Sequence, residues 1–261
     1  MHPSLRECLR PLALLTLPVL SLPASLLAQE LRVTYLANEG VLVESAGTRV
    51  LIDALFRDSL DPYPRHSRAV QEELETGQKP FDGIGLALAT HFHLDHWDAG
   101  AISRFLRSNP QALFASTEQA TAMIPSALRG RVLNLWPTNG QPSTLVAGAA
   151  KVTAIPLKHG ATQNLAYRLE LSGKTVAHLG DADPSVENFE KLASAGPVDL
   201  ALVPFWWLLD SEARSFMKRE WKPRSLAALH IGATDLDSLS ALQEAWPGVW
   251  APTTPREFRP F

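Results

Sequence analysis

Four potential metal ligands lie within six residues of this chain. Thr90 opens the run, and the ligand-type residues that follow it are His91, His93, Asp95 and His96. Imidazole nitrogens and carboxylate oxygens together suit Zn²⁺ and neighbouring divalent ions. A solvated polar turn is the alternative interpretation, but it gives no reason for three of the chain's eight histidines to gather here. The run therefore predicts a metal site.

Three further candidate ligands are distant in sequence but occupy similar places. His159 lies in a predicted loop after a strand, Asp181 follows a glycine at a strand end, and His230 precedes Ile-Gly at another strand end. Ligands converge where strands end at one edge of a sheet. We therefore expect these three residues to meet the histidine run. His91 and His93, two residues apart, can face one ion from an extended segment, which leaves a second ion for the rest.

The elements that must position these residues alternate between strands and helices. Strands are predicted at 31–36, 41–44, 49–52, 86–89, 112–115, 131–135, 151–155, 165–171, 175–179, 198–203 and 225–229, with a turn at 38–40. Helices are predicted at 69–75, 99–106, 116–123, 211–219 and 237–246, and Ser116 stands in capping-box relation to Gln119. Hairpins and crossovers in both halves, without a linker, predict an α/β fold with two sheets and outer helices.

Composition bounds the class of protein. The 261 residues are 46% hydrophobic and 20% charged, an ordinary globular balance with ample material for a core. The formal net charge is −3, and there is no run rich in lysine or arginine. Nothing here attracts a polyanion over long range, so we expect a small-molecule substrate and no nucleic-acid partner. The sequence does not predict an oligomeric state.

Residues 1–28 are typical of a secretory signal peptide. Arg6 and Arg10 precede an apolar stretch that ends at Ala28, before a polar pair. This predicts a secreted or periplasmic mature domain at 29–261. An uncleaved membrane anchor is the alternative, but three prolines in the stretch disfavour a spanning helix, and no other segment is long enough to cross a bilayer. The only cysteine, Cys8, falls in this segment, so the mature domain would form no disulfide.

The ligand pattern resembles the metallo-β-lactamase superfamily. The matching residues are Thr-His-x-His-x-Asp-His at 90–96, then His159, Gly180-Asp181 and His230, so the resemblance spans nearly all of 31–230. It implies a four-layer αββα sandwich of the metallo-β-lactamase type. It also implies two divalent metal ions, with Zn²⁺ expected first and Mn²⁺ or Fe²⁺ also suited to these ligands.

The resemblance assigns each candidate ligand a role. One ion is bound by the residues at His91, His93 and His159. The other is bound by those at Asp95, His96 and His230, and the carboxylate at Asp181 bridges the two. Coordination to a divalent ion can lower the pKa of water to about 7. The hypothesis is that a metal-bound hydroxide attacks a carbonyl carbon or a phosphorus, while Asp95 or Asp181 orients it or relays a proton.

Five more residues have either a structural or a functional interpretation. Asp53 matches a family acidic position and could hydrogen-bond a ligand imidazole, or simply start a turn. His178 is a structural histidine or a neighbour of the ligands, and His66 is expected to be solvated. Trp206 and Trp207 follow a strand, and neighbours in an extended segment point apart, so at most one should line a substrate pocket.

These features predict an exported metal-dependent hydrolase that cleaves a small ester, lactone or phosphodiester. The start of the domain at 35–45 looks most like the ascorbate-6-phosphate lactonase-like branch, although export does not suit a cytosolic sugar phosphate. True β-lactamases of the superfamily generally lack the carboxylate at Asp181, which argues against β-lactam hydrolysis. A nuclease and a non-catalytic metal-binding domain remain as alternatives, and a redox version would need a flavin domain for which there is no room.

Overall fold

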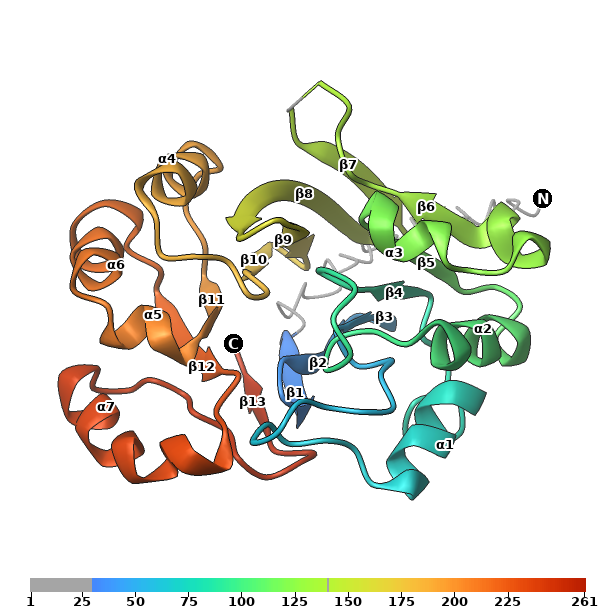
Figure 1. The fold of residues 1–261 in the computed structure, drawn as a ribbon, viewed down its shortest axis with the longest axis horizontal. Helices are drawn as coiled ribbons and strands as arrows, with labels where there is room; N and C mark the ends of the chain where they lie inside the picture. The colour runs from blue at the N-terminus through green and yellow to red at the C-terminus, as the bar shows by residue number, and fades with distance from the viewer. Residues whose placement is uncertain (1–29, 140) are drawn as a thin grey trace, which may run out of the picture.

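Two β-sheets face each other, with helices on the outer face of each (Figure 1). The computed structural model describes residues 30–139 and 141–261. The predicted signal peptide at 1–28 therefore lies outside the described residues. Within the described part of the chain, no helix has the length and apolar character needed to cross a membrane.

The first sheet contains the N-terminal half of the domain and one strand from the C-terminus. Its order is β13 (Phe258–Pro260), β1 (Arg32–Ala37), β2 (Gly40–Ser45), β3 (Thr48–Ile52), β4 (Leu86–Leu88), β5 (Leu113–Ser116) and β6 (Val132–Asn134). Strands β1 to β3 form an antiparallel meander, and β3 to β6 are parallel. The meander predicted from the short strands and tight turns of 31–52 is therefore confirmed.

The second sheet follows the same plan. Its order is β12 (Ser225–Leu229), β11 (Leu200–Pro204), β10 (Lys174–His178), β9 (Thr162–Leu171), β8 (Ala150–His159) and β7 (Ser143–Ala147). Strands β7 to β10 are antiparallel, whereas β10, β11 and β12 are parallel. Each sheet thus has a parallel part whose strand ends lie at one edge.

Seven α-helices lie in the described part of the chain, and all of them flank the sheets. They are α1 (Arg68–Thr76), α2 (Ala99–Ser108), α3 (Glu118–Ala122), α4 (Val186–Ser194), α5 (Phe205–Leu209), α6 (Ser211–Phe216) and α7 (Leu239–Ala245). Figure 1 shows α1 to α3 on one side of the molecule and α4 to α7 on the other. The end predicted for the first helix is confirmed, since Gly77 caps α1 in the left-handed conformation that glycine adopts without steric cost.

Three apolar clusters define the layers. Val33 and Val43 of the first sheet pack with Val152 and Leu169 of the second between the sheets. A second cluster fills the space between the first sheet and α1 to α3, and a third lies between the second sheet and α4 to α7. Because both faces of each sheet are covered, central strands such as β4 and β11 are apolar along their whole length. The predicted αββα sandwich is confirmed.

Several predicted elements differ from the structure. Ser116 is the last residue of β5, and its hydroxyl donates to the carbonyl of Ala89, so the cap of α3 is Thr117 instead. The helix expected at 211–219 is divided between α6 and a π-helical turn, and that at 237–246 begins as a 3₁₀ turn. Strand β8 continues through His159, which was expected in a loop.

Candidate metal centre

All seven predicted ligands meet at one edge of the two sheets. The loop after β4 brings four of them, β8 ends in His159, Asp181 comes three residues after β10, and His230 directly follows β12. Their nitrogen and oxygen atoms form two groups, within each of which all the atoms lie within 4.8 Å of one another. The convergence predicted from strand ends is therefore present in the structure.

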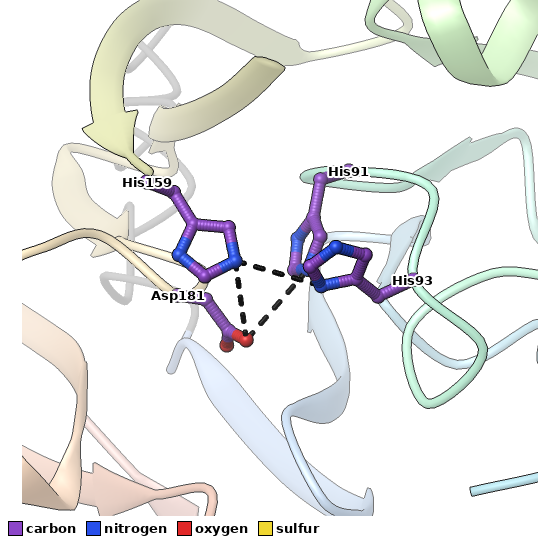
Figure 2. A group of neighbouring side chains, drawn as sticks. All are labelled: His91, His93, His159 and Asp181. Atoms are coloured by element: carbon purple, nitrogen blue, oxygen red, sulfur yellow. Dashed lines mark hydrogen bonds and ion pairs between the residues drawn. The ribbon is translucent and has the colours of Figure 1, made fainter. Parts of the chain in front are cut away.

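The first group contains His91, His93, His159 and Asp181 (Figure 2). Their side chains point from three separate segments toward a common centre. Nε2 of His159 lies 3.5 Å from Nδ1 of His93 and 3.9 Å from Oδ2 of Asp181. That same oxygen is 3.7 Å from Nε2 of His91. Three imidazoles and one carboxylate at these separations fit a divalent ion.

The second group contains Asp95, His96 and His230, all buried. The Nε2 atoms of the two histidines lie 3.4 Å apart. Oδ2 of Asp95 is 3.6 Å from Nε2 of His96 and 3.3 Å from Nε2 of His230. Two imidazoles and a carboxylate around one point fit a second ion, as predicted for these three residues.

Asp181 lies between the two groups and offers one oxygen to each. Its Oδ1 is 3.3 Å from Nε2 of both His96 and His230, whereas its Oδ2 faces His91 and His159. A carboxylate that bridges two ions has this arrangement. The bridging role of Asp181 itself stays a prediction.

The polar atoms of the centre support a bound cation. Nε2 of His91, Oδ1 of Asp181 and Oδ1 of Asp95 are buried and have no hydrogen-bond partner among the described residues. Leaving such atoms unpartnered inside a protein costs free energy, and most buried polar atoms are satisfied. These three atoms belong to residues of the two ligand groups. Divalent ions bound by the groups would give each of them a partner.

The pKa values of the candidate ligands also indicate that the centre binds positive charge. Burial, and then the neighbouring His96, lower the pKa of His91 well below its ordinary value. Burial would also lower the pKa of His96 and His230, but the Asp181 carboxylate raises the pKa of His96 well above its ordinary value and that of His230 to about 9. Burial would raise the pKa of Asp181, yet the two histidines hold it well below its usual range. Protons and metal ions would therefore compete for these sites.

Asp53 fixes the orientation of two ligand imidazoles. Its Oδ2 accepts hydrogen bonds from Nδ1 of His96 at 2.9 Å and from the hydroxyl of Thr90 at 2.6 Å. The Thr90 oxygen in turn accepts from Nδ1 of His91 at 3.0 Å. Both histidines therefore carry their proton on Nδ1 and turn Nε2 toward the centre, as carboxylate partners of metal-binding histidines do. The structure shows the predicted hydrogen bond, which the imidazole of His96 donates to Asp53.

His178 and Gly180 shape the turn that carries Asp181. His178 is fully buried, accepts a hydrogen bond from the Gly180 amide and donates through Nε2 to the carbonyl of Glu39. Gly180 has a φ of +54°, and a Cβ there would lie 2.5 Å from Oδ1 of Asn164. Only glycine fits this conformation and this space. His178 is thus a structural residue that supports a candidate ligand.

The aromatic residues near His230 were only partly predicted. Trp206 and Trp207 lie in the short helix α5, not in an extended segment. Trp207 is buried and donates to the carbonyl of Ala182, whereas the ring of Trp206 lies 5.1 Å from the imidazole of His230. Only Trp206 contacts a candidate ligand, and the expectation that at most one tryptophan lines a substrate pocket stays a prediction. Tyr63, whose ring is 4.0 Å from His230, was missed because its proline-rich loop has no periodic pattern.

The prediction for His66 was wrong. Its side chain is buried, its Nε2 donates to the carbonyl of Ala54 at 3.0 Å, and its ring packs 4.4 Å from that of Phe56. Burial lowers its pKa to about 4. The polar composition of the loop at 56–67 concealed this inward-pointing side chain. Its role is in folding, because it joins the loop to the segment that follows β3.

Glu39, in the turn between β1 and β2, is a buried carboxyl group that the sequence pattern did not reveal. It is 1% exposed, and one of its oxygens lies within 4.8 Å of ligand atoms of His96 and Asp181. Burial, and next the Asp181 carboxylate, raise its pKa well above the usual range. A single glutamate in a predicted turn has no spacing signal that would mark it as part of a site.

Comparison with protein families identifies the class. A family model described as "Beta-lactamase superfamily domain" matches residues 48–247. This match covers most of the chain, which therefore belongs to the beta-lactamase superfamily, and the His/Asp cluster fits the metal site of a metal-dependent hydrolase. A search of curated proteins found no significant match.

Solved structures share the fold at low identity. The metallo-beta-lactamase fold protein YhfI from Bacillus subtilis is 17% identical, with a TM-score of 0.63 over 89% of this chain and 100% of that one. Igni18, a metallo hydrolase from Ignicoccus hospitalis, is 20% identical, with a TM-score of 0.60 over 89% and 98%. CmlA, a diiron beta-hydroxylase from Streptomyces venezuelae, is 17% identical, with a TM-score of 0.54 over 89% and 54%. These likenesses identify the metallo-β-lactamase fold.

Proposed function

We propose that this protein is a hydrolase that uses two divalent metal ions to cleave a small ester, lactone or phosphodiester. The observation that carries the proposal is the position of Asp181 between two ligand groups, with one oxygen directed to each. A carboxylate in this position can bind both ions at once when each group holds one. A single-ion site would leave the other group of buried imidazoles and carboxylates without a counterpart.

The residues of the chain would act as ligands, orienting groups and proton carriers. When bound, divalent ions lower the pKa of water to about 7 and polarise the group under attack. Asp53 and Thr90 hold the Nε2 atoms of two histidines toward the centre. Asp95 points Oδ2 at His230 and leaves Oδ1 without a hydrogen-bond partner among the described residues. That free oxygen could hold a proton on its way to the leaving group.

The surroundings of the site favour an uncharged ester or lactone with an apolar part. The rings of Tyr63 and Trp206 both pack edge-on against the imidazole of His230, at interplanar angles of 83° and 67°. Within the described chain, no lysine or arginine forms an ion pair with Asp95 or Asp181. Aromatic faces bind apolar groups, whereas phosphate recognition commonly uses arginine. A substrate like that of the ascorbate-6-phosphate lactonase-like branch stays a prediction that rests on residues 35–45.

The metal is proposed to be Zn²⁺, with Mn²⁺ and Fe²⁺ as alternatives. Five imidazoles and two carboxylates suit all three ions, so the ligand set does not select one. The similarity to CmlA, named as a diiron enzyme, is a reason to test iron directly. Element analysis of protein produced with each metal, followed by activity measurement, would identify the productive ion.

A hydrolysis panel tests the proposal. Purified protein would be analysed for metal by plasma mass spectrometry and assayed with lactones, aryl esters, phosphodiesters and the β-lactam nitrocefin. We expect about two ions per chain and turnover of an ester or lactone. Asp181→Ala should lose at least one ion and about 100-fold or more in kcat/KM, in keeping with the large share of rate that metal centres supply. Fewer than one ion per chain in the wild type would refute the proposal, and turnover of nitrocefin alone would favour the β-lactam alternative.

We also propose that the protein is exported. The positive residues and apolar stretch of residues 1–28 support this proposal. Expression of the full chain in a bacterium, followed by mass determination of the secreted or periplasmic protein, would test it. A mature chain that begins near Gln29 is the expected result, and an intact chain in the membrane fraction would instead favour the anchor.

A further inference from the structure

Glu39 is a buried carboxyl group that has no role in the hydrolysis proposed above. Its side chain is 1% exposed, and neither of its carboxyl oxygens has a hydrogen-bond partner among the described residues. The nearest charged group that could form an ion pair is His178, whose Nδ1 lies 3.8 Å from Oε2. That nitrogen already accepts a hydrogen bond from the Gly180 amide, so it carries no proton to offer. A buried carboxyl group without a partner requires an explanation.

The turn that carries Glu39 is attached to the metal centre on several sides. Asn38 has a φ of +50°, and its side-chain amide donates to Oδ2 of Asp95 at 3.0 Å. The carbonyl of Asn38 accepts from the amide of His230 at 3.3 Å. A Cβ on Gly40 would lie 2.9 Å from the carbonyl oxygens of Ala37 and Asp53, so the turn is as tight as glycine allows. These contacts fix the direction of the Glu39 side chain relative to the second ligand group.

Glu39 takes part in two clusters of ligand-type atoms, but only one can accept a cation. In the cluster with Asp53 and His178, the other atoms are already used: Asp53 accepts three hydrogen bonds, and both nitrogens of His178 are hydrogen-bonded. In the cluster with His96 and Asp181, all three ligand atoms lie within 4.8 Å of one another. One oxygen of the Glu39 carboxylate therefore lies near His96 of the second group and near Asp181, which directs Oδ1 to that group.

Charge gives the same assignment. Two divalent ions would bring four positive charges into a buried site, where Asp95 and Asp181 supply two negative charges and Asp53, hydrogen-bonded to His96, supplies a third. An uncompensated charge is costly in the protein interior. On the basis of the proposed two-ion function, we propose that Glu39 is an additional ligand of the ion bound by Asp95, His96 and His230. It would approach that ion from the β1–β2 turn, on the floor of the site.

The test compares Glu39→Gln with the wild type and with a matched control, all as full chains. Glu75→Gln is the control, because Glu75 is equally buried but forms two hydrogen bonds with Arg57 at 2.7 and 2.8 Å, away from the centre. Metal-free protein would be titrated with Zn²⁺ by calorimetry and with Co²⁺ by visible spectroscopy, and its thermal unfolding would be recorded. These measurements do not depend on an identified substrate.

We expect E39Q to weaken the binding of one ion about 10- to 100-fold, as loss of a group at a metal site typically does, and to change the Co²⁺ spectrum of that ion only. Metal-free E39Q should unfold at the same temperature as the wild type or higher, because an uncharged amide of the same size replaces a buried carboxyl group that makes no hydrogen bond. E75Q should show the reverse: a lower unfolding temperature when metal-free and unchanged ion binding.

Ion affinities of E39Q within twofold of the wild type would overturn the role of Glu39. If the wild type itself bound fewer than one ion, the proposed function would fail as well, so the two failures are distinguishable. Should E39Q not fold, Glu39→Asp keeps the charge but withdraws the oxygens by one methylene. E39D is then expected to weaken the same ion, and wild-type affinity in E39D would also overturn the proposal.

Discussion

At the residue scale, the candidate metal centre depends on groups outside the seven candidate ligands. An imidazole has two nitrogens, and a metal ligand must present the one without a proton. Asp53 decides this for His96 directly and for His91 through the Thr90 hydroxyl. The Thr90 amide also donates to Asp53, at 2.7 Å, so the whole loop after β4 is held by one carboxylate. Losing the carboxylate should therefore affect both ions together.

We predict that Asp53→Asn weakens the binding of both ions. The new amide nitrogen would face donors, so at least one of the hydrogen bonds from Thr90 or His96 would be lost. Loss of a hydrogen bond to a ligand histidine typically costs 10- to 100-fold in metal affinity. Calorimetric titration with Zn²⁺ would measure this, and circular dichroism of the metal-free variant would serve as the control for folding. Unchanged affinity for both ions would mean that the imidazoles keep their orientation without Asp53.

At the scale of elements, the sequence predicted most of the strands, because short apolar runs between turn residues usually form buried strands in a globular domain. Errors arose where local patterns compete. Ser116 matches a capping box, but β5 extends one residue further and Thr117 becomes the cap. The short helix α5 begins directly after Pro204, a residue that allows a first helical turn as readily as an extended exit. Helix α4 and the edge strands β7 and β13 were not predicted at all.

The candidate ligands could be recognised in the sequence, whereas the residues that surround them could not. His and Asp at spacings that suit metal binding are rare enough to be recognised in a sequence. Asn38, Glu39 and Tyr63 belong to loops, and only the packing of distant segments brings them to the centre. His66 shows the same limit, since its hydrogen bond to Ala54 depends on how the loop at 56–67 folds back. Residue type therefore predicts the ligands, whereas tertiary structure determines their surroundings.

His66 leads to a prediction for the stability of this loop. Its pKa is lowered by burial from 6.5 to about 4 in the folded protein, so the unfolded chain binds more protons between these values. Stability from the neutral imidazole is present above pH 6.5 and is lost as the pH falls toward 4, by about 3 kcal/mol in total. His66→Gln, whose amide can still donate to Ala54, should lessen that loss. Urea unfolding of both proteins at pH 7 and pH 5 would measure it, and equal losses would contradict the assignment.

At the scale of the whole molecule, the centre joins the two sheets. The first sheet supplies the loop after β4, and the second supplies the ends of β8, β10 and β12. Besides the apolar layer between the sheets, these polar residues connect the two halves of the domain, as do hydrogen bonds such as the one that Tyr167 donates to the carbonyl of Ala89. Without cations, this edge of the sheets contains facing imidazoles and carboxylates, several of whose buried atoms have no hydrogen-bond partner among the described residues. Bound ions should therefore hold the halves of the domain together.

Removal of metal should accordingly lower the stability of the entire domain. An ion that binds only the folded protein stabilises it by about 4 kcal/mol when free ion is present at 1,000 times its dissociation constant. For a domain of this size, that corresponds to an unfolding temperature about 8–16 °C higher. Calorimetry with and without a chelator would measure the shift, and Asp181→Ala, which should bind fewer ions, is expected to shift less. If the chelator left the wild-type unfolding temperature unchanged, bound ions would not stabilise the domain, and the apolar layer together with direct hydrogen bonds such as that from Tyr167 to Ala89 would hold the two sheets together.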